Sequence, residues 1–200
     1  CAGQDLRDRN PDGGKVDFAE SLDKNYNRLV RTLRSIEMPV IAAVNGVAAG
    51  AGANIALCAD FVIASRSANF VQAFVHIGLV PDCGGTYFLP RLIGRARTAG
   101  LSMLGDKLTA ETAAEWGLIW KCVDDDQVVG EAQALASHLA TRPTKALALI
   151  RRALDASFDN TLDEQLDLER DLQTVATQTD DFREGVKAFL EKRPAEFKGQ

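Results

Sequence analysis

Small residues crowd one segment of the chain, and this segment constrains the fold more than any other feature of the sequence. Glycine and alanine fill seven of the eight positions from Gly46 to Ala53, between an apolar run at residues 40–44 and another at residues 55–58. We predict a buried strand, a tight loop and then a closely packed helix. The small residues either let this helix pack tightly on a sheet or let the N–H groups at its start approach a ligand that carries negative charge.

The same glycines invite a dinucleotide-binding interpretation, which their spacing excludes. Gly46, Gly50 and Gly52 follow the predicted strand as GxxxGxG, whereas the dinucleotide fingerprint is GxGxxG. The fingerprint also asks for an acidic residue about 20 residues further on, where this chain has Ser65 and Arg66. We therefore do not expect a dinucleotide-binding site of the Rossmann type.

Strands and helices alternate in the first half of the chain, and helices dominate the second half. Apolar runs predict strands over residues 40–44, 61–64 and 119–123, and helical spacing of apolar residues predicts helices over residues 21–37, 127–140, 144–157, 162–177 and 181–191. Thr109 is a predicted N-cap and Gly117 a predicted helix stop. This order is typical of the α/β class, and we expect a core over residues 1–125 and a helical region over residues 126–200.

The composition excludes several classes of function. A net charge of -5 and a pI of about 5.1 do not provide the basic surface that nucleic-acid or membrane-surface binding needs. No apolar run approaches the roughly 18–20 residues of a membrane span. The four cysteines form no CxxC pair and the sequence shows no metal-ligand spacing. We expect reduced thiols, a cytoplasmic protein and no metal site.

Asp82 is the carboxylate most suited to chemistry. It stands in a Pro-Asp-Cys-Gly-Gly turn at residues 81–85, just before a predicted helix. Such an Asp could simply cap the helix. Alternatively, it could be a base that takes a proton from a carbon acidified by a neighbouring thioester.

Three segments together resemble motifs of the crotonase superfamily of acyl-coenzyme A enzymes. Residues 2–6 read AGQDL and match its AGxDL loop, residues 44–52 read VNGVAAGAG and match its oxyanion-hole segment, and residues 78–86 read GLVPDCGGT and match its GLxPxxGGT turn. Two later segments, AEWGL at residues 114–118 and FLEKR at residues 189–193, resemble a family turn and the C-terminal helix. The resemblance runs nearly from end to end, and the order and spacing of the motifs are highly specific.

This resemblance also bears on the start of the chain. Cys1 opens the sequence without a methionine and directly inside the AGxDL-like loop. Members of the superfamily have further strands ahead of that loop. We therefore expect that an N-terminal segment is missing.

The resemblance implies a fold, an assembly and a set of site residues. It implies a ββα spiral core with a C-terminal helical region, a homotrimer or hexamer, and a coenzyme A thioester as substrate with no permanently bound cofactor. The backbone N–H groups of Gln4 and Ala51 would form an oxyanion hole, and Asp82 would be the general acid and base. The residues that would contact coenzyme A are Ala2, Gln4, Asp5, Leu6 and Lys192.

Departures from the family pattern narrow the expected reaction. Hydratases of the superfamily use two glutamates, and this chain has Asn54 and Phe74 at those positions. Neither side chain exchanges a proton at neutral pH, whereas one carboxylate, Asp82, can move a double bond by removing and returning a proton. The sequence therefore resembles the isomerases, and among them the 1,2-epoxyphenylacetyl-CoA isomerases of phenylacetate breakdown most closely.

Other readings stay open. A hydratase using Asp82 alone, and a catalytically silent subunit that binds coenzyme A esters, are the alternatives. The dehalogenases of the superfamily use Asp at the position of Asp82, but they have a tryptophan at position 74 and a histidine after the AGxDL loop, and residues 7–22 contain no histidine. We do not expect dehalogenation.

Overall fold

The computed structural model describes residues 1–5 and 17–200 of the chain. These residues form two compact units, one made of residues 1–5, 17–36 and 40–132 and the other of residues 37–39 and 133–200. The first unit holds the strands, and the second is built mainly from helices. Each unit is described by itself.

The helical stretch at the start of the first unit is not uniform. The sequence predicts one helix over residues 21–37, but the structure has α1 (Phe18–Ser21), a π-helical segment η1 (Leu22–Asn27) and α2 (Arg28–Ser35) in succession. Apolar periodicity does not separate these forms, because the wider π turn shifts the helix face by only a fraction of a turn. The helix ends ahead of Pro39, two residues before its predicted bound, and Ile36 after it is extended.

Two three-stranded sheets are interleaved along the chain. The first sheet has the parallel order β1-β3-β6, made of β1 (Ile41–Val44), β3 (Phe61–Ser65) and β6 (Lys121–Val123). The second has the order β2-β4-β5, in which β2 (Ala48–Ala49) runs parallel to β4 (Asn69–Val71) and β5 (Lys107–Thr109) runs antiparallel to β4. The chain therefore visits one sheet and then the other before each of two helices, α3 (Ala51–Leu57) and α4 (Gly85–Leu104), which is the repeating ββα pattern that the sequence resemblance implied.

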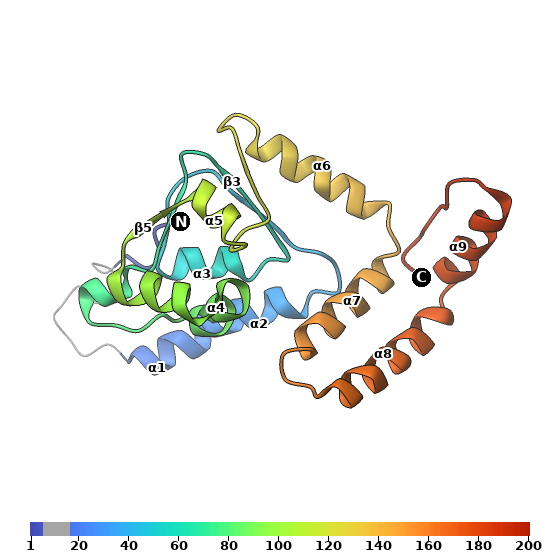
Figure 1. The fold of residues 1–200 in the computed structure, drawn as a ribbon, viewed down its shortest axis with the longest axis horizontal. Helices are drawn as coiled ribbons and strands as arrows, with labels where there is room; N and C mark the ends of the chain where they lie inside the picture. Colours follow the sequence, from blue (N-terminus) through green and yellow to red (C-terminus); the bar gives the residue numbers. More distant parts are fainter. Residues whose placement is uncertain (6–16) are drawn as a thin grey trace. The chain divides into compact units, whose positions relative to one another are not determined.

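The core of the first unit lies where these helices cover the sheets. Its buried side chains include Val62 on β3, Phe70 on β4 and Leu89 on α4. Helix α3 contacts both β1 and β2 and also packs on α4, as the ribbon shows (Figure 1). The short η2 (Ala73–Ile77), a 3-10 helix, lies between β4 and α4 in the chain and contacts α4.

The two predicted helix-end signals, the Thr109 cap and the Gly117 stop, are confirmed. The Thr109 hydroxyl accepts from the N–H of Thr112 and caps α5 (Ala110–Glu115), and Gly117 after this helix has a φ of 78°. The remaining helices lie within two residues of their predicted bounds, as α6 (Val128–Ala140), α7 (Thr144–Ala156), α8 (Leu162–Thr177) and α9 (Asp180–Glu191).

The end of the chain folds back on α9 in the second unit (Figure 1). The buried carboxylate of Asp181 accepts from the N–H groups of Lys198 and Gly199 at 2.7 and 2.8 Å. Arg193 forms a two-pronged ion pair with Glu184 at 2.6 and 2.9 Å. We call residues 193–200 the tail.

Across the described part of the chain, no helix has the length and apolar character to cross a membrane.

Candidate active site

The opening loop of the chain lies against the start of α3. The Ala49 N–H donates to the Cys1 carbonyl at 3.0 Å, and a Cβ on Gly3 would lie 3.4 Å from the Ala51 nitrogen. Gly52 is needed for this approach, because a Cβ there would lie only 2.2 Å from the Cys1 carbonyl oxygen. Gly3, the residue before Gln4, therefore lies against the start of α3.

Ala51 stands at the first position of α3, and its backbone is set by Gly50. Gly50 has φ 54° and ψ −125°, a conformation that residues with a Cβ rarely adopt. Its N–H donates to the Val71 carbonyl at 2.8 Å, which ties the helix start to β4. Within residues 1–5 and 17–200, neither the Ala51 N–H nor the Gln4 N–H donates to a backbone acceptor. Main-chain N–H groups without a backbone acceptor are the kind of donor that stabilises a developing oxyanion.

The side chain of Gln4 has a partner that the sequence did not reveal. The Tyr26 hydroxyl, from the π-helical segment η1, donates to the Gln4 Oε1 at 2.6 Å. The Gln4 amide nitrogen donates to the Asp5 carbonyl at 3.1 Å. Tyr26 looks in the sequence like one apolar position of an amphipathic helix, so periodicity gives no signal for this contact.

Asp82 lies in a turn with an unusual backbone. Cys83 and Gly84 follow it with φ values of 51° and 79°, both in the left-handed region. The Asp82 carbonyl accepts from the Gly85 N–H at 2.8 Å, where α4 begins. The N-cap of α4 is Gly84, without a side-chain hydrogen bond, so the Asp82 side chain does not cap this helix. Its Oδ1 is buried and has no hydrogen-bond partner among the described residues.

Two buried amide side chains lie next to this turn. Asn54, on α3, donates through Nδ2 to the Asp82 carbonyl at 2.8 Å, and Gln72 donates through Nε2 to the Asn54 Oδ1 at 2.8 Å. Both residues are at most 1% exposed. Asn54 is visible in the sequence as a departure from the hydratase pattern, whereas Gln72 has no such signal, because its role depends on a contact across 18 residues of chain.

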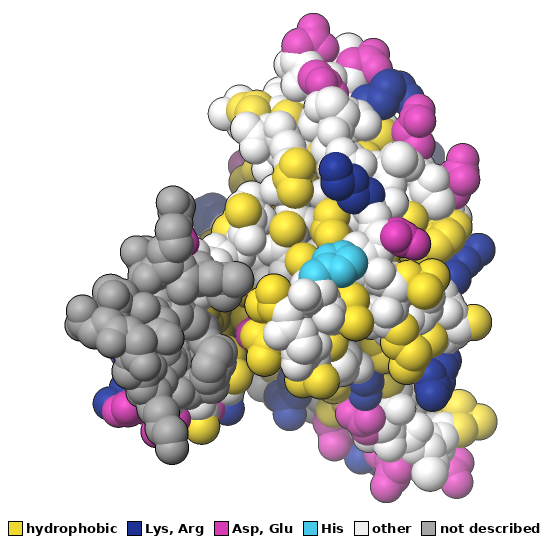
Figure 2. All heavy atoms as spheres, turned by 90° about the vertical axis from the view of Figure 1, so that its left-hand side faces the viewer, with side chains coloured by type: hydrophobic (Ala, Val, Ile, Leu, Met, Phe, Trp, Pro, Cys, Tyr) yellow, Lys and Arg dark blue, Asp and Glu magenta, His cyan; other side chains and the backbone are white. Residues whose placement is uncertain are grey.

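The residues of η2 divide between core and surface. Phe74 is buried, and its ring lies 3.7 Å from the position of a Cβ on Gly50. His76 is exposed, and its Nε2 lies 3.1 Å from the Gly105 carbonyl oxygen. The segment also exposes hydrophobic side chains, and Figure 2 shows hydrophobic side chains gathered around a histidine on one face of the molecule. Exposed hydrophobic residues in this part of the first unit are Val75, Ile77, Leu79 and Val80.

Two buried thiols complete the surroundings of the Asp82 turn. The Cys58 Sγ lies 3.2 Å from the Asn54 carbonyl and 3.8 Å from the Cys83 carbonyl. Burial raises the pKa of the Cys58 thiol to about 11, against a smaller opposing effect of the Arg34 charge. This thiol is therefore protonated at neutral pH and is a poor nucleophile.

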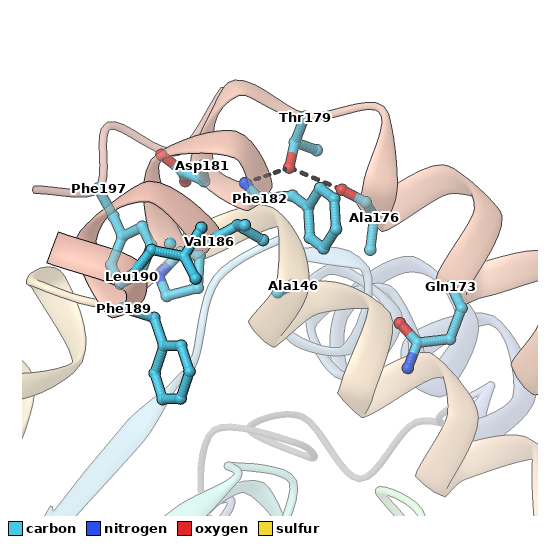
Figure 3. Close-up of a pocket in the computed structure, with 12 residues that line it drawn as sticks. Ala146, Gln173, Ala176, Thr179, Asp181, Phe182, Val186, Phe189, Leu190 and Phe197 are labelled. Atoms are coloured by element: carbon cyan, nitrogen blue, oxygen red, sulfur yellow. Dashed lines mark hydrogen bonds between the residues drawn. The ribbon is translucent and has the colours of Figure 1, made fainter. Parts of the chain in front are cut away.

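The second unit holds a separate apolar pocket. It has a volume of about 440 Å³ and is lined from α8 and α9, from the start of α7 and from Phe197 of the tail (Figure 3). Phe189 and Leu190 on α9 are 82% and 75% exposed. Lys192 ends α9 with a left-handed backbone, φ 56°, and an exposed side chain.

The predicted site residues thus fall into three groups. Gln4 follows Gly3, which lies against Ala51, and Asn54 on the same helix as Ala51 hydrogen-bonds the Asp82 carbonyl. Ala2 and Asp5 are exposed in the same loop, whereas Leu6 lies outside the described residues. Lys192 belongs to the second unit, so its predicted contact with coenzyme A stays a prediction. In the described residues, no group of three or more His, Cys, Asp or Glu side chains could hold a metal ion.

Known proteins resemble the chain over its whole length. Residues 1–200 match the enoyl-CoA hydratase/isomerase family. The chain is 57% identical to the 1,2-epoxyphenylacetyl-CoA isomerase of Escherichia coli K12 and 49% identical to a probable enoyl-CoA hydratase of Rhodobacter capsulatus, and it covers 77% of each relative.

A solved structure gives the same result for the fold. The crystal structure of an enoyl-CoA hydratase from Polaromonas sp. JS666 superposes with a TM-score of 0.93 at 34% identity, over 99% of this chain and 77% of that one. The similarity confirms the crotonase-type fold with its spiral ββα core and C-terminal helices. The chain therefore belongs to the enoyl-CoA hydratase/isomerase family.

Proposed function

We propose that the protein is an acyl-CoA isomerase in which Asp82 moves a proton between two carbons of the acyl group. The observation that carries the proposal is the link between α3 and the Asp82 turn. Ala51 presents a main-chain N–H at the start of α3, and Asn54, one turn later on the same helix, hydrogen-bonds the main chain of Asp82. One helix therefore sets both the oxyanion donor and the base.

In this mechanism the thioester oxygen accepts hydrogen bonds from the N–H groups of Gln4 and Ala51. Ionised Asp82 removes a proton from the carbon next to the thioester of a 3-enoyl-CoA, and the electron pair of the C–H bond moves into an enolate. The protonated carboxyl then returns the proton at the far end of the conjugated system, which yields a 2-enoyl-CoA. Losing one donor of an oxyanion hole typically costs about 2.7–4 kcal/mol of barrier, so the pair is a large part of the rate.

The substrate class follows from the relatives and from the departures at positions 54 and 74. The Escherichia coli relative is named a 1,2-epoxyphenylacetyl-CoA isomerase, and we extend this substrate class, together with cis-3-enoyl-CoA esters, to this chain. The coenzyme A moiety is part of the substrate and would contact Ala2, Gln4, Asp5, Leu6 and Lys192, with no permanently bound cofactor.

Hydration is the second candidate, because the Rhodobacter relative is named a probable enoyl-CoA hydratase. Adding water needs one group to activate the water and another to protonate the carbon. Asn54 offers an amide that is already engaged at both ends, and Phe74 offers a buried ring. Asp82 would have to perform both steps, so we place isomerisation first.

The remaining elements of the proposal concern assembly and location. We propose that the helical C-terminal region, over residues 126–200, mediates a homotrimer or a hexamer. The exposed Phe189 and Leu190 beside the apolar pocket support an interface in this region. The cysteine pattern supports a cytoplasmic location.

Product analysis tests the function. The protein is given cis-3-hexenoyl-CoA, crotonyl-CoA and the epoxide ester of phenylacetyl-CoA in H₂¹⁸O. We expect isomers of the first and third esters without ¹⁸O, and Asp82→Asn should lower kcat by about 10²–10⁴-fold while binding of the esters persists. The exposed Asp106→Asn is the matched control and should retain wild-type turnover. Retained activity in Asp82→Asn, or ¹⁸O in most of the product, would contradict the proposal.

A further inference from the structure

We propose that Asn54 is a positioning residue for Asp82 and that Gln72 fixes the orientation of the Asn54 amide. The inference rests on the function proposed above, because it concerns the same carboxylate. Asn54 and Asp82 are 28 residues apart in the chain, on α3 and in the turn before α4. Their contact joins the element that holds the oxyanion donor to the element that holds the base.

The polarity of the contact is fixed by the groups themselves. The Asp82 carbonyl can only accept a hydrogen bond, so the Asn54 amide must turn its Nδ2 toward it. The Asn54 Oδ1 then faces Gln72, which must in turn present its Nε2. The amide orientations in this chain of contacts therefore have one consistent solution, and flipping either amide would set two donors or two acceptors against each other.

The turn that Asn54 holds needs such support. Cys83 has a left-handed backbone although it is not a glycine, and Gly84 follows in the same region. Backbone in sparsely populated regions persists only where its surroundings impose it. The Asp82 carbonyl receives two hydrogen bonds, one from the Gly85 N–H inside the turn and one from Asn54 outside it. Of these two bonds, only the second comes from a distant part of the chain.

Close packing reinforces the contact. A Cβ on Gly85 would lie 2.3 Å from the Asn54 Nδ2, so the amide occupies the space that a side chain at this position would need. The Asn54 side chain is thus enclosed between Gly85 and Gln72, and Asn54 itself is 0% exposed. It has little room to take another orientation.

By holding the main chain of Asp82, Asn54 also positions the carboxylate that acts as the base. The Asp82 Oδ1 is buried without a hydrogen-bond partner among the described residues, so no described side chain holds this oxygen by a hydrogen bond. The backbone of the turn fixes the direction of the Asp82 Cα–Cβ bond, so a shift of the turn moves the carboxylate with it. Because Asn54 lies one turn after Ala51 on α3, the amide sets the base relative to the oxyanion donor.

A double-mutant cycle tests this role in the full chain, with cis-3-hexenoyl-CoA as the probe. Asn54→Ala should lower kcat by about 10- to 100-fold with KM nearly unchanged, because small errors of position at a reacting centre have effects of this size. In the Asp82→Asn background the same change should cost less than about 2-fold, since a residue that acts through Asp82 has nothing left to position. Equal losses in both backgrounds, or no loss with Asp82 intact, would overturn the inference.

Further variants separate positioning from stability. Asn54→Asp keeps the shape and the acceptor for Gln72 but replaces the donor, and it should lose kcat like Asn54→Ala. Gln72→Met should lose less, because Asn54 keeps its bond to Asp82. Ile119→Val, a buried change elsewhere in the core, should lower the melting temperature and leave kcat intact. A kcat loss in Ile119→Val as large as that of Asn54→Ala would show a merely structural effect and overturn the inference. Turnover that persists in Asp82→Asn alone would instead refute the proposed function.

Discussion

The Asn54 amide nitrogen lies 2.8 Å from the main-chain carbonyl oxygen of Asp82 and donates a hydrogen bond to it. The hydrogen bond goes to the main chain of Asp82 and not to its carboxylate. Asn54 stands at one of the two positions where the sequence resemblance expects a glutamate in hydratases, and in the proposed function it acts on the main chain of the base. The residues around this contact yield specific expectations.

Gly85→Ala should impair catalysis. The added Cβ would lie 2.3 Å from the Asn54 Nδ2, so the amide or the turn must move. Overpacking of this kind costs about 1–3 kcal/mol of folding stability, and we expect kcat to fall at least 10-fold. Steady-state kinetics and thermal unfolding would measure the two effects.

Gly100→Ala, in the same helix α4, is the matched control. A Cβ there meets nothing within 4 Å. We expect unchanged kinetics and a gain of about 0.5–1 kcal/mol in stability, because alanine is the better helix former. A similar kcat loss in both variants would refute the role assigned to the space at Gly85.

Asn54→Glu should lower the kcat of isomerisation at least as much as Asn54→Ala does, without creating a hydratase. The glutamate would set an acceptor against the Asp82 carbonyl, where the wild-type residue supplies a donor. Phe74 would still leave the second hydratase position without an ionisable group. Conversion of crotonyl-CoA and of cis-3-hexenoyl-CoA, followed by chromatography, would decide the point. A gain of 3-hydroxyacyl product in this single variant would contradict the assignment.

The ion pair at the tail should make stability depend on acid pH. The side-chain hydrogen bonds from Arg193, then the Glu196 N–H, lower the pKa of Glu184 to about 2. A carboxylate with a depressed pKa stabilises the folded state above its ordinary value near 4.5, and this contribution is lost as the pH falls toward 2. Wild type should therefore exceed Glu184→Gln in stability at neutral pH, and the difference should shrink between about pH 5 and pH 2.

Denaturant unfolding over this pH range would measure the effect. The exposed Glu169→Gln serves as the control and should follow wild type throughout. A constant difference between wild type and Glu184→Gln at every pH would show that the ion pair is not the source.

Thiol reactivity should follow burial. Cys1 is exposed, whereas Cys58 and Cys83 are buried. With a pKa of about 11, only about one Cys58 thiol in a thousand is ionised at pH 8. Iodoacetamide should therefore label Cys1 first and reach the two buried thiols only after denaturation, which peptide mass spectrometry would record. Rapid labelling of Cys58 in the folded protein would contradict this order.

Short-range chemistry made much of the fold predictable. The Thr109 cap, the Gly117 stop and the span of α8 depend on residues a few positions apart, and the structure has them where the sequence indicated. The π-helical segment over residues 22–27 escaped prediction, because its apolar spacing barely differs from that of an α-helix.

The site was less predictable for a different reason. Gly50 and the small residues around it could be recognised in the sequence as a place where the backbone comes close to another group. Gly50 has a positive φ, which glycine adopts readily, so the residue type itself is a signal. The partners of Asn54, the Tyr26 contact with Gln4 and the folded tail each join residues that are distant in the chain. Short-range sequence patterns do not predict contacts between residues that are far apart in the chain.

Amide side chains do not titrate, and this gives the Asn54–Gln72 pair a property that a carboxylate at position 54 would lack. In the proposed reaction the base is neutral for part of every cycle and charged for the rest. The Asn54–Gln72 pair that positions the base has no proton to gain or lose. Its hydrogen bonds therefore stay the same while the charge of Asp82 alternates. The position of the Asp82 carboxylate thus does not depend on its charge.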